Sequence, residues 1–509
     1  MAFTKSPETS TYRTVEIEFT DTSWYRAGYA SQHRDPEVIN MFYDRNSNEN
    51  QTRSMVLVKR PGLSSIDTLS LNKTTSASKI NGFFQDDSSN YIYWSTDNKV
   101  FSCNLNTNTI TQIATITGTA TSYVNSVGFC SFLTSTGTRY ICFNNGSELW
   151  YHVVGSGTST QVVDADYPAS TYPTVVFLDG YLFVIKKDTG DIYNSDLDTP
   201  ANWTAGNYVT AEINSDLALA LAKVKNYLVC FGRDGIEFFY DAANPTGSPL
   251  GRNESFYKSV TLTSNVCAIG DSLFFSGRLK NQGQRIYELE GESLKPISAS
   301  WVDRYIQNNG YNSLTSSGMS EQQGYGISLN GNHFYLFNIP ATDILMVYDL
   351  YNKFWYRWSL APTNASINQV QAIWNANDLT QDYPFIAMGN QSTISSLANN
   401  VYQDYTENFT CSYTTADYTS DTFNWKTCHR VGLYCDYPAT GGVETYVQIS
   451  WSDDDGNSFT TARNLNVHTN NPYIVQCGRF RSRSWRLEYS DNYPFRMWGL
   501  TMDLNIGNI

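Results

Sequence analysis

A hairpin unit recurs along the chain, and this repeat limits what the chain can fold into. Each copy has an apolar strand, a tight polar turn and an aromatic-rich strand, as in residues 140–143, 145–146 and 149–151. The Asn-Gly and Asp-Gly pairs in several turns supply the positive φ that two-residue hairpins require. Copies begin near residues 91, 140, 181, 227, 273, 334 and 385. This spacing is close to the ~40–50 residues of a four-stranded propeller blade.

The repeat predicts an all-β fold with a β-propeller of about seven four-stranded blades between residues 76 and 400. A β-sandwich and a β-solenoid remain the alternatives. Trp301–Ile306 is the best candidate for a short helix, in an insertion between blades.

The two ends of the chain lie outside the repeat. Residues 1–75 include the alternating stretch Thr14–Phe19, and we expect this extended segment to dock or pack on the C-terminal part. Residues 401–509 have longer strands, Val443–Trp451 and Tyr473–Tyr489, which suit a separate, smaller β-sheet module.

The charge and the apolar pattern restrict the possible partners. The chain has 34 basic and 48 acidic residues and a net charge of −14. An acidic protein repels the phosphate backbone, so a DNA-gripping role is disfavoured, whereas a conduit through which DNA slides is compatible with this sign. No apolar stretch approaches the ~20 residues that span a bilayer, and the N-terminus shows no signal peptide. We therefore expect the chain to be made and kept in a cytoplasm, without a membrane-spanning segment.

Cysteine and histidine give no clear sign of a cofactor, a metal or an active site. The nine cysteines form no CxxC pair and mostly lie in apolar runs, which is typical of buried reduced thiols. Cys428, His429 and Cys435 have a spacing that fits no common zinc site. The sequence contains no HExxH, GxSxG or phosphate loop. We expect no catalytic residues, no cofactor and no metal, and we expect the five histidines, His33, His152, His333, His429 and His468, to pack or lie on the surface.

One local motif is specific. Residues 452–459 fit the Asp-box pattern S-x-D-x-G-x-S/T-F/W, through Ser452, Asp454, Gly456, Ser458 and Phe459. In such a hairpin loop the Asp and Ser side chains bond to the backbone and the aromatic ring packs beneath. Asp-boxes occur in sialidases, so a glycosidase must be considered. The motif is structural even there, and the sialidase signature near the N-terminus is absent, so we expect a structural role.

The densest basic run is Arg479–Arg486. On a strand, Arg479, Arg481 and Arg483 would share one face. Three interpretations remain open: a solvated strand face, a surface that docks acidic side chains of a neighbouring subunit, and a contact with phosphate.

Several stretches together resemble the tail nozzle family of short-tailed bacteriophages, also called packaged-DNA stabilisation proteins. The central stretch is Tyr172–Phe183, followed by Gly190–Leu197 and Gly235–Tyr240. The outer stretches are Val58–Leu63, Val347–Leu350, Phe354–Ser359, Trp451–Gly456 and Cys477–Arg483. Each stretch is weak alone, but their order and spacing cover the chain from about residue 30 to 505. The N-terminal segment departs most from the family pattern.

The resemblance implies a non-enzymatic structural protein of the virion tail. Such a protein would form a homohexameric ring that continues the DNA channel below the portal and its adaptor, retains packaged DNA and opens for ejection. Its partners would be other copies of itself, adaptor or portal-proximal proteins, and tail fibre or needle proteins, with genomic DNA passing through without specific binding. Assembly would take place in the bacterial host cytoplasm. The alternative from another class is a receptor-binding or carbohydrate-binding propeller, which would show exposed aromatic side chains clustered at one mouth of the propeller.

Overall fold

The computed structural model describes most of the chain and divides it into two compact units. The described residues are 13–19, 37–45, 55–74, 78–86, 88–117, 127–212, 217–279, 282–291, 293–309, 322–339, 342, 344–359, 370–375, 384–388, 392–398, 400–419, 422–438 and 440–507. The propeller unit comprises residues 64–355 and 364–397, and the terminal unit comprises residues 1–63, 356–363 and 398–509. The unit boundaries therefore fall at residues 63 and 398 rather than at the expected residues 75 and 400, and residues 64–75 belong to the propeller unit.

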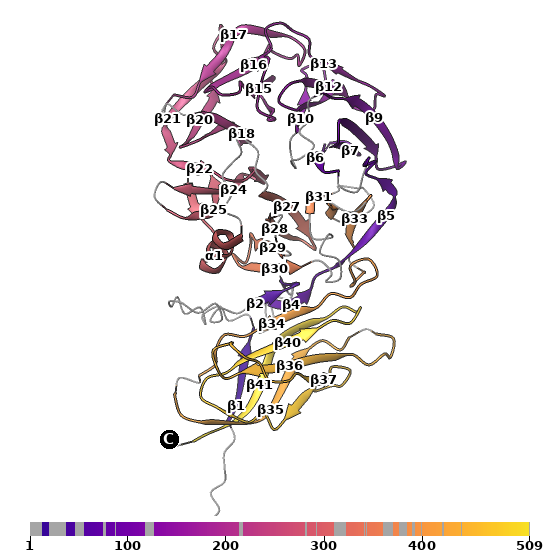
Figure 1. The fold of residues 1–509 in the computed structure, drawn as a ribbon, viewed down its shortest axis with the longest axis vertical. Coiled ribbons are helices and arrows are strands. Elements are labelled where there is room, and N and C mark those ends of the chain that lie inside the picture. The colour runs from indigo at the N-terminus through magenta and orange to yellow at the C-terminus, as the bar shows by residue number, and fades with distance from the viewer. Residues whose placement is uncertain are drawn as a thin grey trace, which may run out of the picture. The chain divides into compact units, whose positions relative to one another are not determined.

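The propeller unit consists of antiparallel sheets that follow one another along the chain (Figure 1). The first sheet has β6 (Ile80–Gln85), β7 (Tyr91–Thr96), β8 (Lys99–Asn104) and β9 (Thr109–Thr115). The second has β10 (Gly128–Leu133), β11 (Arg139–Asn144), β12 (Leu149–Val153) and β13 (Ser159–Gln161). The third has β14 (Val176–Leu178), β15 (Tyr181–Ile185), β16 (Asp191–Ser195) and β17 (Trp203–Thr210). The fourth has β18 (Ala218–Val224), β19 (Tyr227–Gly232), β20 (Ile236–Asp241) and β21 (Leu250–Lys258).

The remaining sheets depart from this plain order. The fifth has β22 (Val260–Leu262), β23 (Cys267–Ile269), β24 (Ser272–Leu279), β25 (Gln284–Glu290) and β26 (Ser293–Pro296). The sixth begins with β27 (Gln323–Leu329), β28 (Asn332–Asn338) and β29 (Ile344–Asp349), and the chain continues into β30 (Trp355–Ser359), where the unit boundary falls. The seventh has β31 (Val370–Asn375), β32 (Pro384–Met388) and β33 (Thr393–Ala398), with β5 (Gly62–Ser70) as its outer strand.

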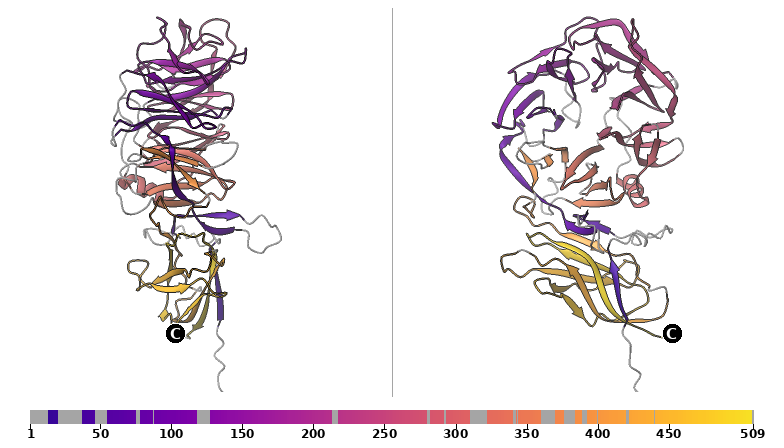
Figure 2. Two further views of the ribbon diagram at one scale, coloured as in Figure 1. Left: turned by 90° about the vertical axis from the view of Figure 1, so that its right-hand side faces the viewer. Right: turned by 180° about the vertical axis from the view of Figure 1, so that it is seen from behind.

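The seven sheets form a closed ring of blades. One strand of each blade contacts a strand of the next in the order β6, β10, β14, β18, β23, β27 and β31, and β31 of the last blade contacts β6 of the first. The ring is closed by β5, which comes from the N-terminal side of the propeller and pairs with β33 near the other end. The hydroxyls of Ser65 and Thr393 lie 2.7 Å apart across this pair. The view from behind in Figure 2 shows the blades arranged around this ring. The structure confirms the predicted all-β propeller.

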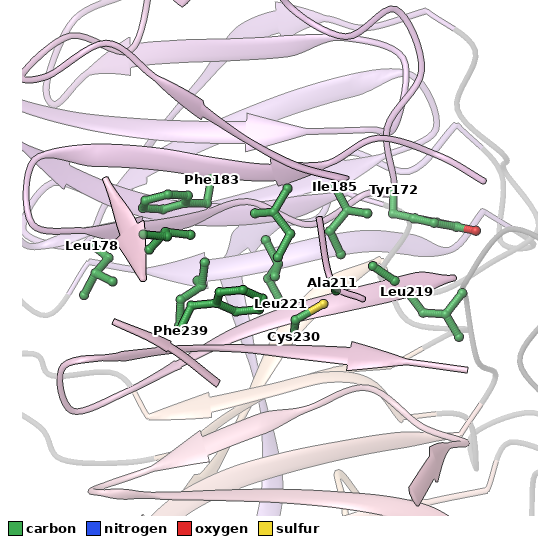
Figure 3. Packing of buried hydrophobic residues seen from close by; sticks show 13 residues of the cluster. Tyr172, Leu178, Phe183, Ile185, Ala211, Leu219, Leu221, Cys230 and Phe239 are labelled. Carbon is green, nitrogen blue, oxygen red and sulfur yellow. The ribbon is translucent and has the colours of Figure 1, made fainter. Parts of the chain in front are cut away.

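The hydrophobic core of the propeller lies between neighbouring blades. Between the third and fourth blades, Phe183 and Ile185 of β15 face Leu221, Cys230 and Phe239 of the next blade (Figure 3). Equivalent clusters join the first blade to the second, the second to the third, the fourth to the fifth, and the fifth to the sixth. Since both faces of a blade are covered by its neighbours, middle strands such as β15 and β19 are buried along almost their whole length, whereas outer strands such as β17 are mostly exposed or half-buried.

The hairpin turns agree only in part with the sequence. Asp97 has φ +53° and Gly146 has φ +87°, as their turns require. At residues 234–235, however, neither Asp234 nor Gly235 lies in the left-handed region. That turn keeps the Gly232 N–H bonded to the Gly235 carbonyl at 2.7 Å without a positive φ.

The terminal unit contains two facing β-sheets. The first sheet has β1 (Arg13–Glu18), β3 (Met41–Arg45), β4 (Met55–Lys59), β35 (Lys426–Cys435), β38 (Tyr473–Val475), β39 (Arg479–Phe480) and β41 (Arg496–Ile506). The second has β2 (Glu37–Ile39), β34 (Cys411–Thr414), β36 (Tyr446–Ser452), β37 (Arg463–Asn466) and β40 (Ser484–Tyr489), and residues 356–359 of β30 run beside β2. Ring pairs such as Phe19–Tyr413 at 4.3 Å and Tyr43–Tyr356 at 5.9 Å join the two sheets.

The single helix of the described residues is α1 (Ser300–Asn309). It lies between the fifth and sixth blades and buries Val302 and Ile306 against them, which confirms the predicted short helix in an insertion. Among the described residues, no helix combines the length and the apolar character needed to cross a membrane.

Candidate functional site

A buried arginine fork holds together three distant segments of the terminal unit. The Arg60 guanidinium donates to both carboxylate oxygens of Asp404, with nitrogen–oxygen distances of 3.0 and 2.6 Å. The same group donates to the Asn40 side-chain oxygen at 3.0 Å and to the Ser359 carbonyl at 2.8 Å, and it lies over the Phe409 ring. Both members of the ion pair have side chains that are 0% exposed. A buried charge needs partners of this kind, and here every guanidinium nitrogen has one.

Gly62 allows the chain to pass closely beside this fork. Its N–H donates to the Val401 carbonyl at 2.6 Å, and a Cβ at this position would lie 1.9 Å from the Gln403 carbonyl oxygen. The Leu63 N–H then donates to Asp404. The stretch Val58–Leu63, which contributed to the family resemblance, therefore has a structural role: Arg60 and Gly62 position the chain where it enters β5.

The Asp-box residues come together in one hairpin loop after β36. The Ser452 hydroxyl donates to the Asp454 carboxylate at 2.7 Å, and the Gly456 N–H donates to the Ser452 hydroxyl at 2.9 Å. Asp454 also accepts from the N–H and the hydroxyl of Ser458, at 2.9 and 2.6 Å. These hydrogen bonds, first that of Ser452, lower the pKa of Asp454 to about 2. The Arg486 guanidinium lies over the Phe459 ring, with its central carbon 3.5 Å from the centre of that ring. The Asp454 carboxylate therefore stabilises the turn of this loop.

The three arginines do not share one strand face, which corrects the expectation from the sequence. β39 contains only Arg479 and Phe480, and Arg483 lies just before β40. Arg483 is 1% exposed and turns inward, where it pairs with Asp453 at 2.6 and 2.7 Å and donates to the Cys477 carbonyl. Its guanidinium also stacks on the rings of Phe480 and Trp451. Arg483 turns inward because its countercharge, the carboxylate of Asp453, lies in the Asp-box loop 30 residues away along the chain. Arg483 thus ties that loop to the core.

Arg479 and Arg481 stay on the surface. Both guanidinium groups lie over the ring of Trp425, at 5.5 and 4.9 Å from its centre. Trp425 and its neighbour Lys426 could not be recognised from the sequence, because no local pattern links them to the arginine run. The pairing of β35 with β39, which sets Thr427 opposite Arg479, brings them together.

Two of the histidines pack on aromatic rings, and most of the cysteines are buried. His152 is buried with its ring 5.8 Å from that of Tyr93, and burial lowers its pKa. His333 bonds to Ser328 and the His468 ring packs on Tyr437, while His33 lies outside the described residues. All nine cysteines are free, seven of them buried. No group of three or more His, Cys, Asp or Glu side chains in the described ranges is arranged to hold a metal ion.

Comparison with solved structures gives distant likenesses. The N-terminal domain of Nup159 has a TM-score of 0.41 at 10% identity, with 71% of this chain and 98% of that chain covered. The extracellular domain of the putative one component system BT4673 from B. thetaiotaomicron has a TM-score of 0.42 at 11% identity, with 81% and 48% covered. A chain of the Mitotic Checkpoint Complex has a TM-score of 0.38 at 12% identity, with 69% and 93% covered. Likenesses at this level support no conclusion about function.

Family comparison is more informative. No curated protein matches the chain in sequence. The phage stabilisation family described as "Bacteriophage P22 Gp10, beta-propeller" matches residues 32–401, a range that contains all seven blades. The chain therefore belongs to the bacteriophage P22 Gp10 β-propeller family.

Proposed function

We propose that this protein forms the tail nozzle of a short-tailed bacteriophage, as a ring of six copies that continues the DNA channel below portal and adaptor. The family match over residues 32–401 carries the proposal, because it makes the chain a bacteriophage structural protein associated with packaged-DNA stabilisation. The ring would retain packaged DNA, open for ejection and carry fibre or needle proteins. It would assemble in the host cytoplasm and remain in the virion.

The charge of the chain supports a conduit. With a net charge of −14, the protein repels the phosphates of passing DNA. A wall lined by Asp and Glu side chains would let DNA slide, whereas basic side chains would hold it by counterion release. We therefore expect acidic residues to dominate the channel wall.

The carbohydrate-binding alternative gains no support from the propeller surface. Among the described residues of the propeller unit, the exposed large aromatic side chains are Tyr208, Tyr240 and Tyr351. Tyr208 and Tyr240 lie on strands of the third and fourth blades, and Tyr351 follows β29 of the sixth, so the exposed aromatics are few and are spread over three of the seven blades.

A test of the proposed function is to make phage particles without this protein. We expect such particles to package DNA and then lose it, so that the genome becomes sensitive to added nuclease. Purified protein added before the loss should restore protection. Particles that retain protected DNA without the protein would contradict the proposed function.

A further inference from the structure

The surface around Trp425 differs in charge from the rest of this acidic chain. Four residues, Phe423, Trp425, Arg479 and Arg481, form what we call the Trp425 patch. The side chain of Phe423 is 84% exposed and that of Trp425 is 38% exposed. Arg479 and Arg481 are also exposed, and neither guanidinium forms an ion pair or side-chain hydrogen bond with any residue that the structure describes. Two cations without carboxylate partners therefore lie over the exposed ring of Trp425, and the exposed side chain of Phe423 comes two residues before it in the same turn.

A buried lysine, Lys426, holds the backbone of the patch in place. Lys426 is 0% exposed, and its ammonium donates to the carbonyls of Thr422, Asn424 and Arg481 at 2.7, 3.1 and 2.7 Å. These bonds tie the turn that carries Phe423 and Trp425 to the segment that carries Arg481. Burial lowers the pKa of Lys426, as expected for a cation removed from water. The Gly507 N–H holds the Trp425 carbonyl at 2.8 Å. The patch is therefore preorganised, which reduces the entropy lost when a partner binds.

The chemistry of the patch fits a protein partner that carries carboxylates. Trp and Arg are the residue types that dominate binding energy at protein interfaces, where an aromatic ring fills a pocket and a guanidinium meets a carboxylate. An arginine stacked on an indole ring loses little freedom when it forms that bond. Duplex DNA is a poorer match, because two arginines on a chain of charge −14 release few counterions.

The chain itself is a source of carboxylates. It has 48 acidic residues against 34 basic ones. In the terminal unit, Asp455 at the tip of the Asp-box loop is exposed and has no hydrogen bond or ion pair with the described residues. Copies of so acidic a chain repel one another unless a local cationic surface faces the carboxylates of the neighbour.

We propose that the Trp425 patch is an interface that binds carboxylates of a second copy of this chain. The inference rests on the proposed function, since a ring of copies is the setting in which the contact forms. Arg479 and Arg481 would pair with acidic side chains of the neighbour, and Phe423 and Trp425 would be covered by it. Arg483, which is committed to Asp453, takes no part.

Photo-crosslinking in assembled phage particles tests this proposal. A photoreactive phenylalanine analogue replaces Phe423, particles are formed from a mixture of isotope-labelled and unlabelled protein, and crosslinked peptides are identified by mass spectrometry. We expect crosslinks between labelled and unlabelled copies, at a peptide that contains Asp or Glu. The double variant Arg479→Ser, Arg481→Ser in the same background should lose most of this product. Both side chains are exposed, so its thermal unfolding midpoint should not change. The same analogue at Leu197, which is 60% exposed on the propeller, is the control for random encounters.

Each other outcome counts against the proposal. Crosslinks to another virion protein or to DNA would show that the patch has a different partner. Crosslinks that stay within one copy, or none beyond the Leu197 control, would show that no copy covers it. If the double variant gives as much crosslinked product as the parent protein, Arg479 and Arg481 do not contribute to the interface. Particles that lack this chain altogether would instead contradict the proposed function, and the interface with it.

Discussion

At the scale of single residues, the pair of Arg60 and Asp404 makes the sharpest prediction. Replacing Arg60 by Met leaves the buried Asp404 carboxylate without its countercharge, which should cost about 3–5 kcal/mol of unfolding free energy. Arg496→Met is the matched control, since Arg496 pairs with Asp436 with side chains 38% and 50% exposed. Such an exposed pair contributes about 0–1 kcal/mol. Urea unfolding, followed by hydrogen exchange of amides in the terminal unit, measures the loss of unfolding free energy in each variant. Equal losses in Arg60→Met and Arg496→Met would show that the buried Arg60–Asp404 pair does not hold the segments together.

Asp454 gives a prediction about pH. Its pKa is lowered to about 2 by hydrogen bonds from Ser452 and Ser458. A carboxyl group whose folded pKa lies below its unfolded value of about 3.9 stabilises the fold above that value and loses this effect as the pH falls through about 2. NMR titration of the Asp454 carboxyl carbon should show the low pKa. Ser458→Ala should raise it toward the ordinary value, and Ser458→Thr, which keeps the hydroxyl, should not. An ordinary pKa in the parent protein would contradict the loop geometry.

At the scale of elements, β5 is expected to hold the propeller ring closed. Leu69 of this strand is 1% exposed and packs with Ile80 and Trp94 of the first blade and Ile394 of the last. Leu69→Ala should therefore cost about 2–5 kcal/mol and make the ring more sensitive to protease. Leu197→Ala, at a position 60% exposed, should change stability by less than about 0.5 kcal/mol. If both variants unfold alike, β5 does not hold the ring.

Elements were predictable where their signals are local. The hairpin of β11 and β12 follows from its apolar strands and the Asn145-Gly146 turn, and the structure sets Cys142 opposite Tyr151 as such a hairpin requires. The pairing of β5 with β33 could not be predicted, because the partners are more than 300 residues apart along the chain and no local pattern links them. Arg483 was misplaced for the same reason: its partner Asp453 is remote in sequence, so alternation alone placed it on the surface.

At the scale of the whole molecule, we expect no glycosidase activity. The Asp454 carboxylate of the Asp-box is held by Ser452 and Ser458, and His152 and His468 pack on the aromatic rings of Tyr93 and Tyr437. A purified sample should leave a fluorogenic sialoside intact over hours. Turnover that disappears when one acidic residue is replaced would contradict this expectation.

The most direct test of the central claim is cryo-electron microscopy of the virion tail. A ring of identical subunits closes at one fixed rotation, so its symmetry identifies the assembly. We predict six copies of this chain around the DNA channel below the portal and adaptor, each with a seven-bladed propeller. Threefold or twelvefold density at that level, or a tail without this chain, would contradict the account.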